Sequence, residues 1–196
     1  MAKRTSAQAA ETREAILAAA RMLFTEDGYN ATSIAAISDA AGVTKGALFH
    51  HFSAKEQLFL EVWRQLQVEM DADAREQAIA NRSKSDPYAA FLAGCRVYLD
   101  WTARPDYQRI VIVDGPAVLG MARWHKLDFE LGNDNMVRGT EFLARHGHFP
   151  KELAHPAAVL LQAALNGAGF VLSAEDPDVT REEVFVTFER LLRGLR

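Results

Sequence analysis

Apolar residues recur along most of the chain at the three- and four-residue spacing of amphipathic α-helices. In residues 9–27 the positions i, i+4, i+7 and i+8 are apolar, occupied by Ile16, Ala20, Leu23 and Phe24. Gly28 follows where this pattern stops, and a glycine commonly ends a helix because it tolerates the backbone conformation required there. The spacing therefore predicts a first helix over residues 9–27.

Two short helices and one long helix are predicted next. Thr32 is a good N-cap for a second helix that runs to about residue 41, and Gly42 then breaks it. A third short helix begins near Thr44. Ser53 and Glu56 have the spacing of a capping box, which predicts a fourth helix that continues to about residue 80.

The rest of the chain has the same helical character. A polar loop over residues 81–87 is the best candidate boundary, and Pro105 must end the helix that follows it. The Asp-Gly-Pro sequence at 114–116 is a strong turn signal, and two internal glycines weaken the expectation that 121–145 is unbroken. Further helices are predicted at 106–113, 121–145, 154–173 and 179–193. Because no strand pattern or repeat is present, the sequence predicts an all-α fold of about nine helices.

The composition is that of a folded protein with a sizeable core. Of the 196 residues, 49% are hydrophobic and 24% are charged, a balance that excludes wholesale disorder. The longest apolar runs fall far short of the roughly 20 residues that cross a bilayer, and no signal-peptide core follows the basic start, so we expect a cytoplasmic protein. The single cysteine, Cys95, has no disulfide partner and is expected to be a small buried side chain.

The net charge of −4 is unevenly divided along the chain. Residues 1–60 carry six basic and six acidic side chains, so the acidic excess lies in the remainder. The basic residues of this first segment cluster at its start and between Lys45 and Lys55, and local placement governs attraction to phosphate more than net charge does. The overall acidity is therefore compatible with a nucleic-acid partner.

Residues 34–52 fit a helix-turn-helix, in which two short helices and a tight turn allow one helix to enter a major groove. Ser38 is small enough for close helix approach, and Gly42 supplies the turn. Three apolar residues form the wedge between the helices: Ile37, Val43 and Leu48. The polar and aromatic residues expected on the outer side are Thr44, Lys45, Phe49 and His50, with His51 and Lys55 where the next helix starts. These groups suit phosphates and base edges.

Residues 12–63 resemble the N-terminal signature of the TetR/AcrR family of bacterial transcription regulators. The matching phrases are FTEDGY at 24–29, NATS at 30–33, AGVTKG at 41–46 and LFHHF at 48–52, followed by Lys55-Glu56. The resemblance implies a DNA-binding domain over 1–53 and a ligand-binding and dimerisation domain over 54–196. The fourth helix, 54–80, would connect the two.

The resemblance also implies roles at the DNA for particular residues. Thr32 or Ser33, with the backbone at that helix start, would bind a phosphate. Thr44 and Lys45 would face bases or nearby phosphates, and Gly46 would permit close approach of the backbone to DNA.

His51 and Lys55 would contact phosphates in the same way. Two positions depart from the family pattern, since Phe49 stands where tyrosine is usual and Val43 replaces a frequent polar residue. Phe49 lacks the hydroxyl contact but can touch a thymine methyl group, whereas Val43 leaves the base specificity unpredictable. His50 completes this set, and the His50-His51 pair is not a metal site because adjacent helical side chains point about 100° apart.

In this family the C-terminal domain commonly dimerises through its last two long helices. Apolar residues nearly surround the 154–173 helix and form a stripe on the 179–193 helix. Together they provide more apolar surface than one small core needs, which indicates a four-helix interface between two subunits. The candidate dimer residues are Leu161, Ala164, Leu165, Ala168, Phe185, Phe188 and Leu192. A purely internal core is the alternative.

The same domain commonly binds a small molecule, and aromatic residues supply candidate pocket walls. These are Phe91, Tyr98, Trp101, Tyr107, Trp124, Phe129 and Phe142. Asp114, Gln108 or His125 could orient a polar group of the ligand. Each aromatic residue could instead belong to the core. The predicted effector is largely apolar, and aromatic and cationic compounds are both open.

These observations favour a homodimeric repressor that binds a near-palindromic double-stranded DNA operator and is released by a small, largely apolar effector. The alternative is an architectural or protein-recruiting DNA-binding dimer without a small-molecule ligand. The sequence contains no nucleophile elbow, P-loop or paired metal-ligand helix, so we expect no enzyme activity, cofactor or metal site. The operator, the effector and the direction of regulation stay open.

Overall fold

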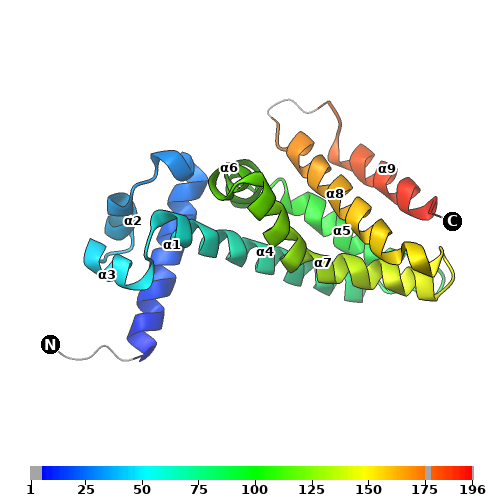
Figure 1. The fold of residues 1–196 in the computed structure, drawn as a ribbon, viewed down its shortest axis with the longest axis horizontal. Helices are drawn as coiled ribbons and strands as arrows, with labels where there is room; N and C mark the ends of the chain where they lie inside the picture. Colours follow the sequence, from blue (N-terminus) through cyan, green and yellow to red (C-terminus); the bar gives the residue numbers. More distant parts are fainter. Residues whose placement is uncertain (1–5, 175–177, 196) are drawn as a thin grey trace.

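A computed structural model describes residues 6–174 and 178–195, except for the side chains of 132–134. The described residues are helical throughout their regular elements and contain no strand, which confirms the all-α prediction (Figure 1). The elements are α1 (Ser6–Ala31), α2 (Ile34–Ala40), α3 (Lys45–His51), α4 (Lys55–Ala80), α5 (Ala89–Trp101), η1 (Tyr107–Asp114), α6 (Gly115–Leu119), α7 (Met121–Arg145), η2 (Lys151–Leu153), α8 (Ala154–Leu172) and α9 (Arg181–Arg193).

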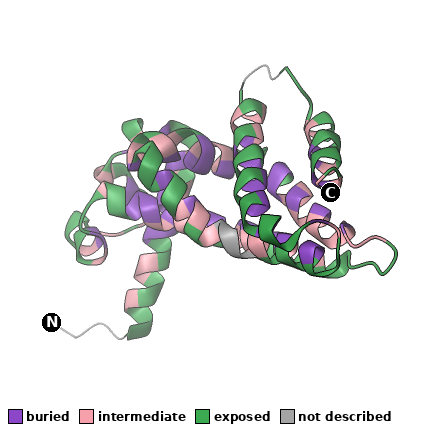
Figure 2. Cartoon of the chain, turned by 45° about the vertical axis from the view of Figure 1, so that its right-hand side comes forward, coloured by how far each residue is buried: buried purple, intermediate pink, exposed green. Residues whose placement is uncertain are grey.

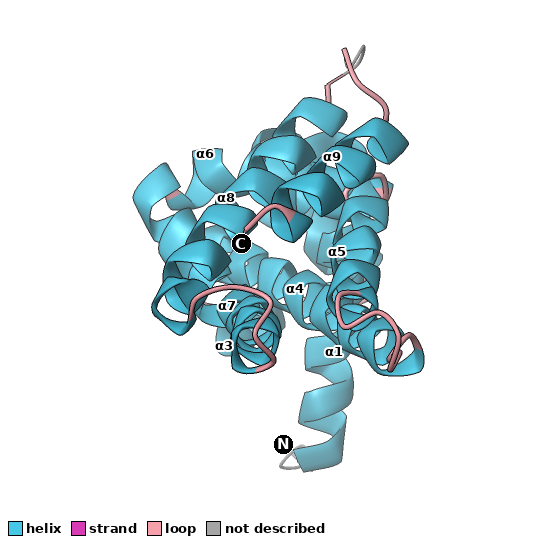
Figure 3. Ribbon diagram, turned by 90° about the vertical axis from the view of Figure 1, so that its right-hand side faces the viewer, coloured by secondary structure: helices cyan, strands magenta, loops and turns pink. Residues whose placement is uncertain are grey.

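Helices α1 to α3 form a small unit at one end of the molecule, and α4 runs from this unit into a larger bundle of α5 to α9 (Figure 1). The small unit has its own apolar centre, made by fully buried side chains that include Phe24, Ile37 and Leu48. In the bundle, α4 packs against α5, α7 packs against α8, and α9 contacts both α5 and α8 (Figure 3). Helix α4 is therefore shared by both parts.

The start of the chain follows the sequence prediction at Gly28 and differs from it at the next N-cap. Gly28 interrupts the first helix, as predicted, with φ 77° and ψ 169°, and one further helical turn follows to Ala31. Only glycine adopts this backbone conformation readily. The N-cap of α2 is Ser33, whose Oγ accepts a hydrogen bond from Ala36 N at 3.1 Å, and not Thr32.

The start of α4 also differs from the predicted capping box. The N-cap is Ala54, which makes no side-chain cap. Instead, Gln57 Oε1 accepts hydrogen bonds from Ser53 N at 2.7 Å and Ser53 Oγ at 2.9 Å. Glu56 pairs with Arg123 of α7 at 2.7 Å. The polar residues of the predicted box therefore secure this helix start, but through other partners.

The predicted turn at 114–116 is wrong. Residues Tyr107–Asp114 form a π-helical segment, and the chain continues directly into α6, with Pro116 in its first turn. Proline is well tolerated there because the first amide groups of a helix need no internal acceptor. Helix α7 runs unbroken from Met121 to Arg145 despite its two glycines.

Helix α8 is largely apolar in composition. Together with η2 it forms a segment, Lys151–Leu172, that is long and apolar enough by length and composition alone to cross a membrane. About one third of the residues in its most apolar stretch are buried, because one side of α8 packs into the bundle. Figure 2 shows exposed positions along both α8 and α9, and apolar residues are among them.

Candidate DNA-binding surface and effector cavity

The turn between α2 and α3 has the geometry expected for a helix-turn-helix. Gly42 has a φ of 65°, and Val43 N donates to Ser38 O at 3.0 Å, which closes the turn. Ile37 and Leu48 are fully buried between the helices and Val43 is half-buried, as the wedge prediction requires. The two helices are therefore held at a fixed angle by a compact apolar contact.

The outer side of α3 is open to solvent. Thr44 is its N-cap, and Thr44 Oγ1 accepts a hydrogen bond from Ala47 N at 3.1 Å, so α3 begins where the sequence predicts. Lys45, Gly46 and His50 are exposed, and Phe49 exposes 51% of its surface although it is aromatic. The structure thus brings five of the predicted DNA-contacting residues to one solvent-facing surface.

Thr32 and Lys55 lie differently from the prediction. Thr32 is buried, and its Oγ1 donates to Gly28 O at 2.8 Å. Lys55 Nζ donates to Tyr29 O at 2.8 Å and to Thr32 O at 2.9 Å, and lies 4.1 Å from the centre of the Tyr29 ring. Burial lowers the pKa of Lys55 from its ordinary value. The Lys55 side chain therefore holds the start of α4 to the end of α1, whereas the Thr32 side chain bonds only within the end of α1. Ser33 remains exposed at the start of α2.

His51 differs from its neighbour His50 in exposure. Its side chain is half-buried at the end of α3, with its ring 5.5 Å from that of His50. Within the part of the chain that the structure describes, no group of three or more histidine, cysteine or acidic residues could hold a metal ion.

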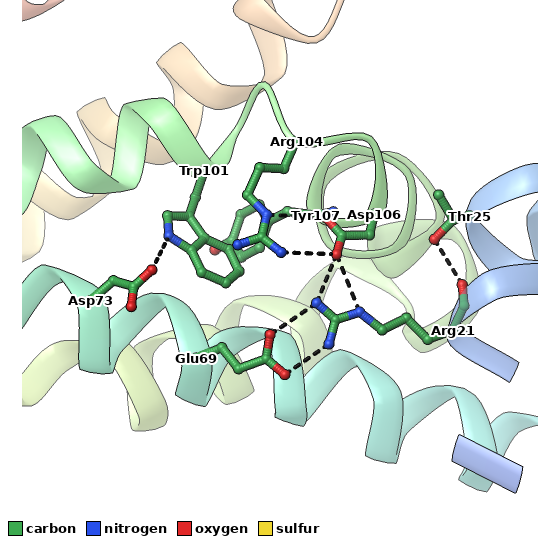
Figure 4. A network of polar contacts seen from close by, with 8 residues as sticks. All are labelled: Arg21, Thr25, Glu69, Asp73, Trp101, Arg104, Asp106 and Tyr107. Carbon is green, nitrogen blue, oxygen red and sulfur yellow. Dashed lines mark hydrogen bonds and ion pairs between the residues drawn. The ribbon is translucent and has the colours of Figure 1, made fainter. Parts of the chain in front are cut away.

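The junction between the small unit and the bundle centres on Arg21 of α1 (Figure 4). Its guanidinium donates to both carboxylate oxygens of Glu69 on α4, at 2.7 and 2.9 Å, and to Asp106 Oδ2 at 2.7 Å. Asp106 caps η1 by accepting from Tyr107 N at 2.8 Å, and also pairs with Arg104. One arginine thus joins α1, α4 and the start of η1.

The far end of η1 makes a second junction, through Asp114. Its Oδ2 accepts a hydrogen bond from Tyr29 N at 2.7 Å and pairs with Arg109 Nε at 3.3 Å. Arg109 also lies against Gly28, where an added Cβ would be 1.8 Å from its Nη2 atom. Asp114 therefore belongs to the contact with α1, and the prediction that it lines the effector pocket is wrong.

The ion pair at Asp106 predicts a pH-dependent stability. Burial alone would raise the pKa of Asp106, but hydrogen bonds from Arg21, Arg104 and Tyr107 N hold it below the ordinary value of 3.8. The pair therefore stabilises the fold above about pH 4, and this stabilisation is lost as the pH falls through the lowered pKa. Asp106→Asn keeps the cap but removes the charge, so we expect a loss of about 2 kcal/mol in urea unfolding at pH 7.

The same comparison at pH 3 supplies the control. The difference in unfolding free energy between wild type and Asp106→Asn should shrink there, because the carboxylate of the unfolded wild-type chain, with its ordinary pKa of 3.8, binds a proton at that pH and the native carboxylate resists doing so. A difference that is equally large at pH 7 and pH 3 would contradict a role for the charge of Asp106.

A cavity of about 740 Å³ lies between α4, α5, α7 and α8. Three of the predicted aromatic residues line it: Phe91, Tyr98 and Phe142. Cys95 contributes a buried thiol to its wall, and burial raises the pKa of this thiol. Phe129 lines an adjoining pocket of about 400 Å³ with His125. Both volumes fall in the range of small-molecule binding sites.

The other aromatic candidates belong to the core and not to the cavity wall. Trp124 is fully buried and its Nε1 donates to Val111 O at 3.0 Å, while Trp101 Nε1 donates to Asp73 Oδ2 at 3.0 Å. Tyr107 is also fully buried, behind the wall residue Gln67. Their indole and phenol groups have partners inside the protein, which explains why large aromatic residues could be placed there.

Sequence reasoning missed a buried polar cluster in the wall of the cavity. Asp128 of α7 accepts hydrogen bonds from the side-chain amides of three residues: Gln67 at 2.8 Å, Gln162 at 3.2 Å and Asn166 at 2.6 Å. All four are buried. Four polar residues on the inner stripes of α4, α7 and α8 are a signal that the sequence does contain, since such stripes are otherwise apolar.

The predicted dimer residues divide into two groups. Most are buried inside the subunit and form its internal core, namely Leu161, Leu165, Phe185, Phe188 and Leu192. Ala164 is exposed and Ala168 half-buried. The apolar residues that do face solvent include Leu160, which is 70% exposed, and Leu191, which is 57% exposed. Most of the residues predicted for the dimer interface therefore lie on the inner faces of α8 and α9. For these residues the alternative of an internal core is correct.

Comparison with known proteins addresses both parts of the chain. Residues 16–62 match the family described as bacterial regulatory proteins, tetR family, and residues 88–195 match the family described as tetracyclin repressor-like, C-terminal domain. A crystal structure of a TetR-family transcriptional regulator from Pectobacterium atrosepticum is 36% identical, with a TM-score of 0.82 over 98% of this chain and 97% of that one.

Curated relatives match over shorter lengths. The probable acrEF/envCD operon repressor of Escherichia coli is 30% identical over 78% of this chain and 64% of its own length. The transcriptional regulator AcrR of Shigella flexneri is 48% identical over 32% of this chain and 29% of its own length. The chain thus spans less than two thirds of these relatives. Because the C-terminal family alone matches more than half of the chain, and the helix-turn-helix family matches the start, the chain belongs to the TetR/AcrR family of bacterial transcription regulators.

Proposed function

We propose that the protein is a ligand-responsive transcriptional repressor that binds a near-palindromic DNA operator as a homodimer. The exposed outer side of α3 carries this proposal, because it presents a helix N-cap, a lysine and an aromatic side chain around the open backbone of Gly46. Such a surface fits the major groove, with α3 as the recognition helix. A dimer would place two copies of α3 in successive major grooves, about 34–36 Å apart.

The exposed faces of α8 and α9 support the homodimer. Leu160, Ala164, Gly167 and Val171 follow one another at i, i+4, i+7 and i+11 and are all exposed, a set we call the α8 stripe. Its small residues permit close helix approach, and Leu191 of α9 extends the apolar surface. A four-helix interface between two subunits would bury these residues. In this proposal, residues 1–53 bind DNA, and residues 54–196 bind the effector and the second subunit.

A route from the cavity to α1 supports the response to a ligand. Gln67 lines the cavity and accepts a hydrogen bond from the buried Tyr107 O–H at 2.5 Å. Tyr107 is the first residue of η1, whose ends hold α1 through Asp106 and Asp114. A ligand that displaces Gln67 would shift η1 and change the angle of α1, and DNA would weaken ligand binding reciprocally.

The cavity favours this function over an architectural dimer without a ligand, since tight packing would be expected in such a protein. The named relatives are regulators and repressors, which supports a non-enzymatic role in the cytoplasm.

Lys45→Ala tests the DNA-binding surface. Since each dimer carries two copies of Lys45, we expect operator affinity to fall by about 10- to 100-fold at fixed salt, with an unchanged unfolding free energy. If Lys45 binds phosphate, the slope of log affinity against log salt should also decrease in magnitude by about two per dimer. Fluorescence anisotropy with DNA flanking the protein's own gene provides the measurement.

Lys126→Ala is the matched control for Lys45→Ala. Lys126 is an exposed lysine on α7, far along the chain from the helix-turn-helix, and its removal changes the net charge by the same amount. Equal loss of affinity in both variants would contradict a specific role for α3. Lys55→Ala is unsuitable for this purpose because it breaks the contacts between α1 and α4.

A further inference from the structure

The cavity has two chemically different ends. Gln67, Asp128 and Gln162 lie in its wall towards the middle of the bundle. Further along α4 and α7 the wall contains arginines, at the ends of both helices away from the small unit (Figure 1). The two helices run in the same direction, since Glu56 pairs with Arg123 and Gln67 pairs with Asp128. Both sets of arginines therefore lie at one end.

Two buried tyrosines fix the orientation of the amides at the inner end. Tyr107 O–H donates to Gln67 Oε1, and Tyr98 O–H donates to Asn166 Oδ1 at 3.0 Å. Burial raises the pKa of both tyrosines well above the ordinary value, so both keep their protons. Each amide must then turn its NH₂ group towards the carboxylate of Asp128.

Gln162 leaves one acceptor over at this end. Its Nε2 points to Asp128, and its Oε1 is buried with no hydrogen-bond partner among the described residues. Asp128 itself pairs with no cation in the described part of the chain. A buried acceptor without a partner carries a free-energy penalty that a ligand donor would remove. A ligand group that donates a hydrogen bond to Gln162 Oε1 would therefore be favoured at the inner end.

The outer end is positively charged. Arg75 and Arg82 on α4 and the following loop, and Arg138 and Arg145 on α7, line the cavity. Within the described residues, the guanidinium groups of Arg75, Arg82 and Arg145 form no ion pair. Such an arginine rim attracts carboxylate or phosphate groups and disfavours entry of a cation.

The wall between the two ends is mostly apolar. It is lined by Met70, Ile79, Phe91, Leu131, Met136 and Phe142. From Asp128 to Arg138 the rise along α7 is about 15 Å, at 1.5 Å per residue. A ligand that touches both ends must therefore be elongated.

We propose that the effector is an elongated amphiphile with an anionic head on the arginine rim, an apolar body, and a neutral hydroxyl group that donates to Gln162 Oε1. A cation is disfavoured because it would have to pass the rim, and because Asp128 already accepts three amide hydrogen bonds. This inference rests on the proposed function, since it assigns a ligand class to the same cavity.

Four probes of equal chain length test this assignment on the full-length protein by isothermal titration calorimetry. They are ω-hydroxydodecanoic acid, dodecanoic acid, dodecanol and dodecyltrimethylammonium. The charged probes are used below their critical micelle concentrations and dodecanol below its solubility limit. We expect the hydroxy acid to bind about tenfold more tightly than dodecanoic acid, because only it satisfies the buried acceptor. It should also bind about tenfold more tightly than dodecanol, and this difference should shrink with added salt.

Two variants assign these differences to the two ends. Gln162→Leu should remove the preference for the hydroxy acid over dodecanoic acid, and Arg75→Gln/Arg145→Gln should remove the preference for acid over alcohol. Lys84→Gln/Lys151→Gln is the matched control for the rim, since it also removes two positive charges, and both lysines are exposed but do not line the cavity. The comparison of the four probes on the wild-type protein tests the proposal even if a variant fails to fold.

Tighter binding of dodecyltrimethylammonium than of the hydroxy acid would overturn the proposal, as would equal affinities for all probes or binding of none. Operator binding without any probe is measured in the same preparation by anisotropy. Intact operator binding with no probe binding would refute the ligand class alone, whereas loss of both would also count against the proposed function.

Discussion

Leu160→Arg is expected to separate the dimer into subunits and to weaken operator binding by at least about a hundredfold. Leu160 is 70% exposed on a single subunit, so the substitution leaves the internal core unchanged. In a dimer built on the α8 stripe it would place two arginines in an apolar contact, where neither is paired. A monomer binds only one half-site and loses the gain from two linked contacts, which reaches 10²- to 10⁴-fold.

Val68→Arg is the matched control for Leu160→Arg. Val68 is also an exposed aliphatic residue, but it lies on α4 and outside the α8 stripe. Analytical ultracentrifugation should show a dimer for wild type and Val68→Arg and a monomer for Leu160→Arg. A dimeric Leu160→Arg protein would contradict the proposed interface, whatever its affinity for DNA.

Tyr107→Phe is expected to abolish the effect of the ligand on DNA binding while leaving DNA binding itself intact. The substitution removes the hydroxyl that connects Gln67 in the cavity wall to η1. Coupling between two sites commonly changes affinity by about 5- to 150-fold, and we expect the factor for the variant to fall below about threefold. The measurement is operator affinity with and without saturating ligand, by anisotropy.

Tyr88→Phe controls for the loss of a buried phenol. Tyr88 is buried at the start of α5, and its ring packs against Arg193 and His148, away from η1. Its response to the ligand should equal that of wild type. Should Tyr107→Phe respond fully as well, the route through η1 is wrong. Urea unfolding shows whether either variant has lost overall stability.

The helix-turn-helix could be predicted from the sequence because its determinants are local. Gly42 in the turn, the buried pair Ile37 and Leu48, and the helix start at Thr44 lie within a few residues of one another, and each is where the sequence predicts it. The polar side chains at the edge of this unit were harder to place. Whether Thr32 or Ser33 caps α2 depends on which hydroxyl faces the interior, and spacing alone does not decide between neighbours.

The errors in the larger part have two physical causes. Asp114 contacts Tyr29, which is 85 positions away in the sequence, so no local pattern distinguishes this junction residue from a pocket residue. The apolar residues that nearly encircle α8 provide no clear outer face, and Leu161 and Leu165 point inwards while Leu160 points outwards. Periodicity identifies a helix with such a composition but does not identify its partner.

The cavity could be predicted only in part for a similar reason. Phe91, Tyr98 and Phe142 line it, whereas Trp101, Tyr107 and Trp124 fill the core beside it. Aromatic residues serve both purposes, and only the packing separates them. The cluster around Asp128 is a more informative signal, because buried polar residues on otherwise apolar stripes need a specific partner.

The most direct test of the central proposal is selection of bound fragments from genomic DNA by the purified protein, freed of ligand by denaturation and refolding. We predict enrichment of a near-palindromic sequence whose half-sites are one helical turn apart, and loss of that enrichment in both Lys45→Ala and Leu160→Arg. Failure of the wild-type protein to enrich any sequence would contradict the proposal that it is a homodimeric, sequence-specific DNA-binding regulator.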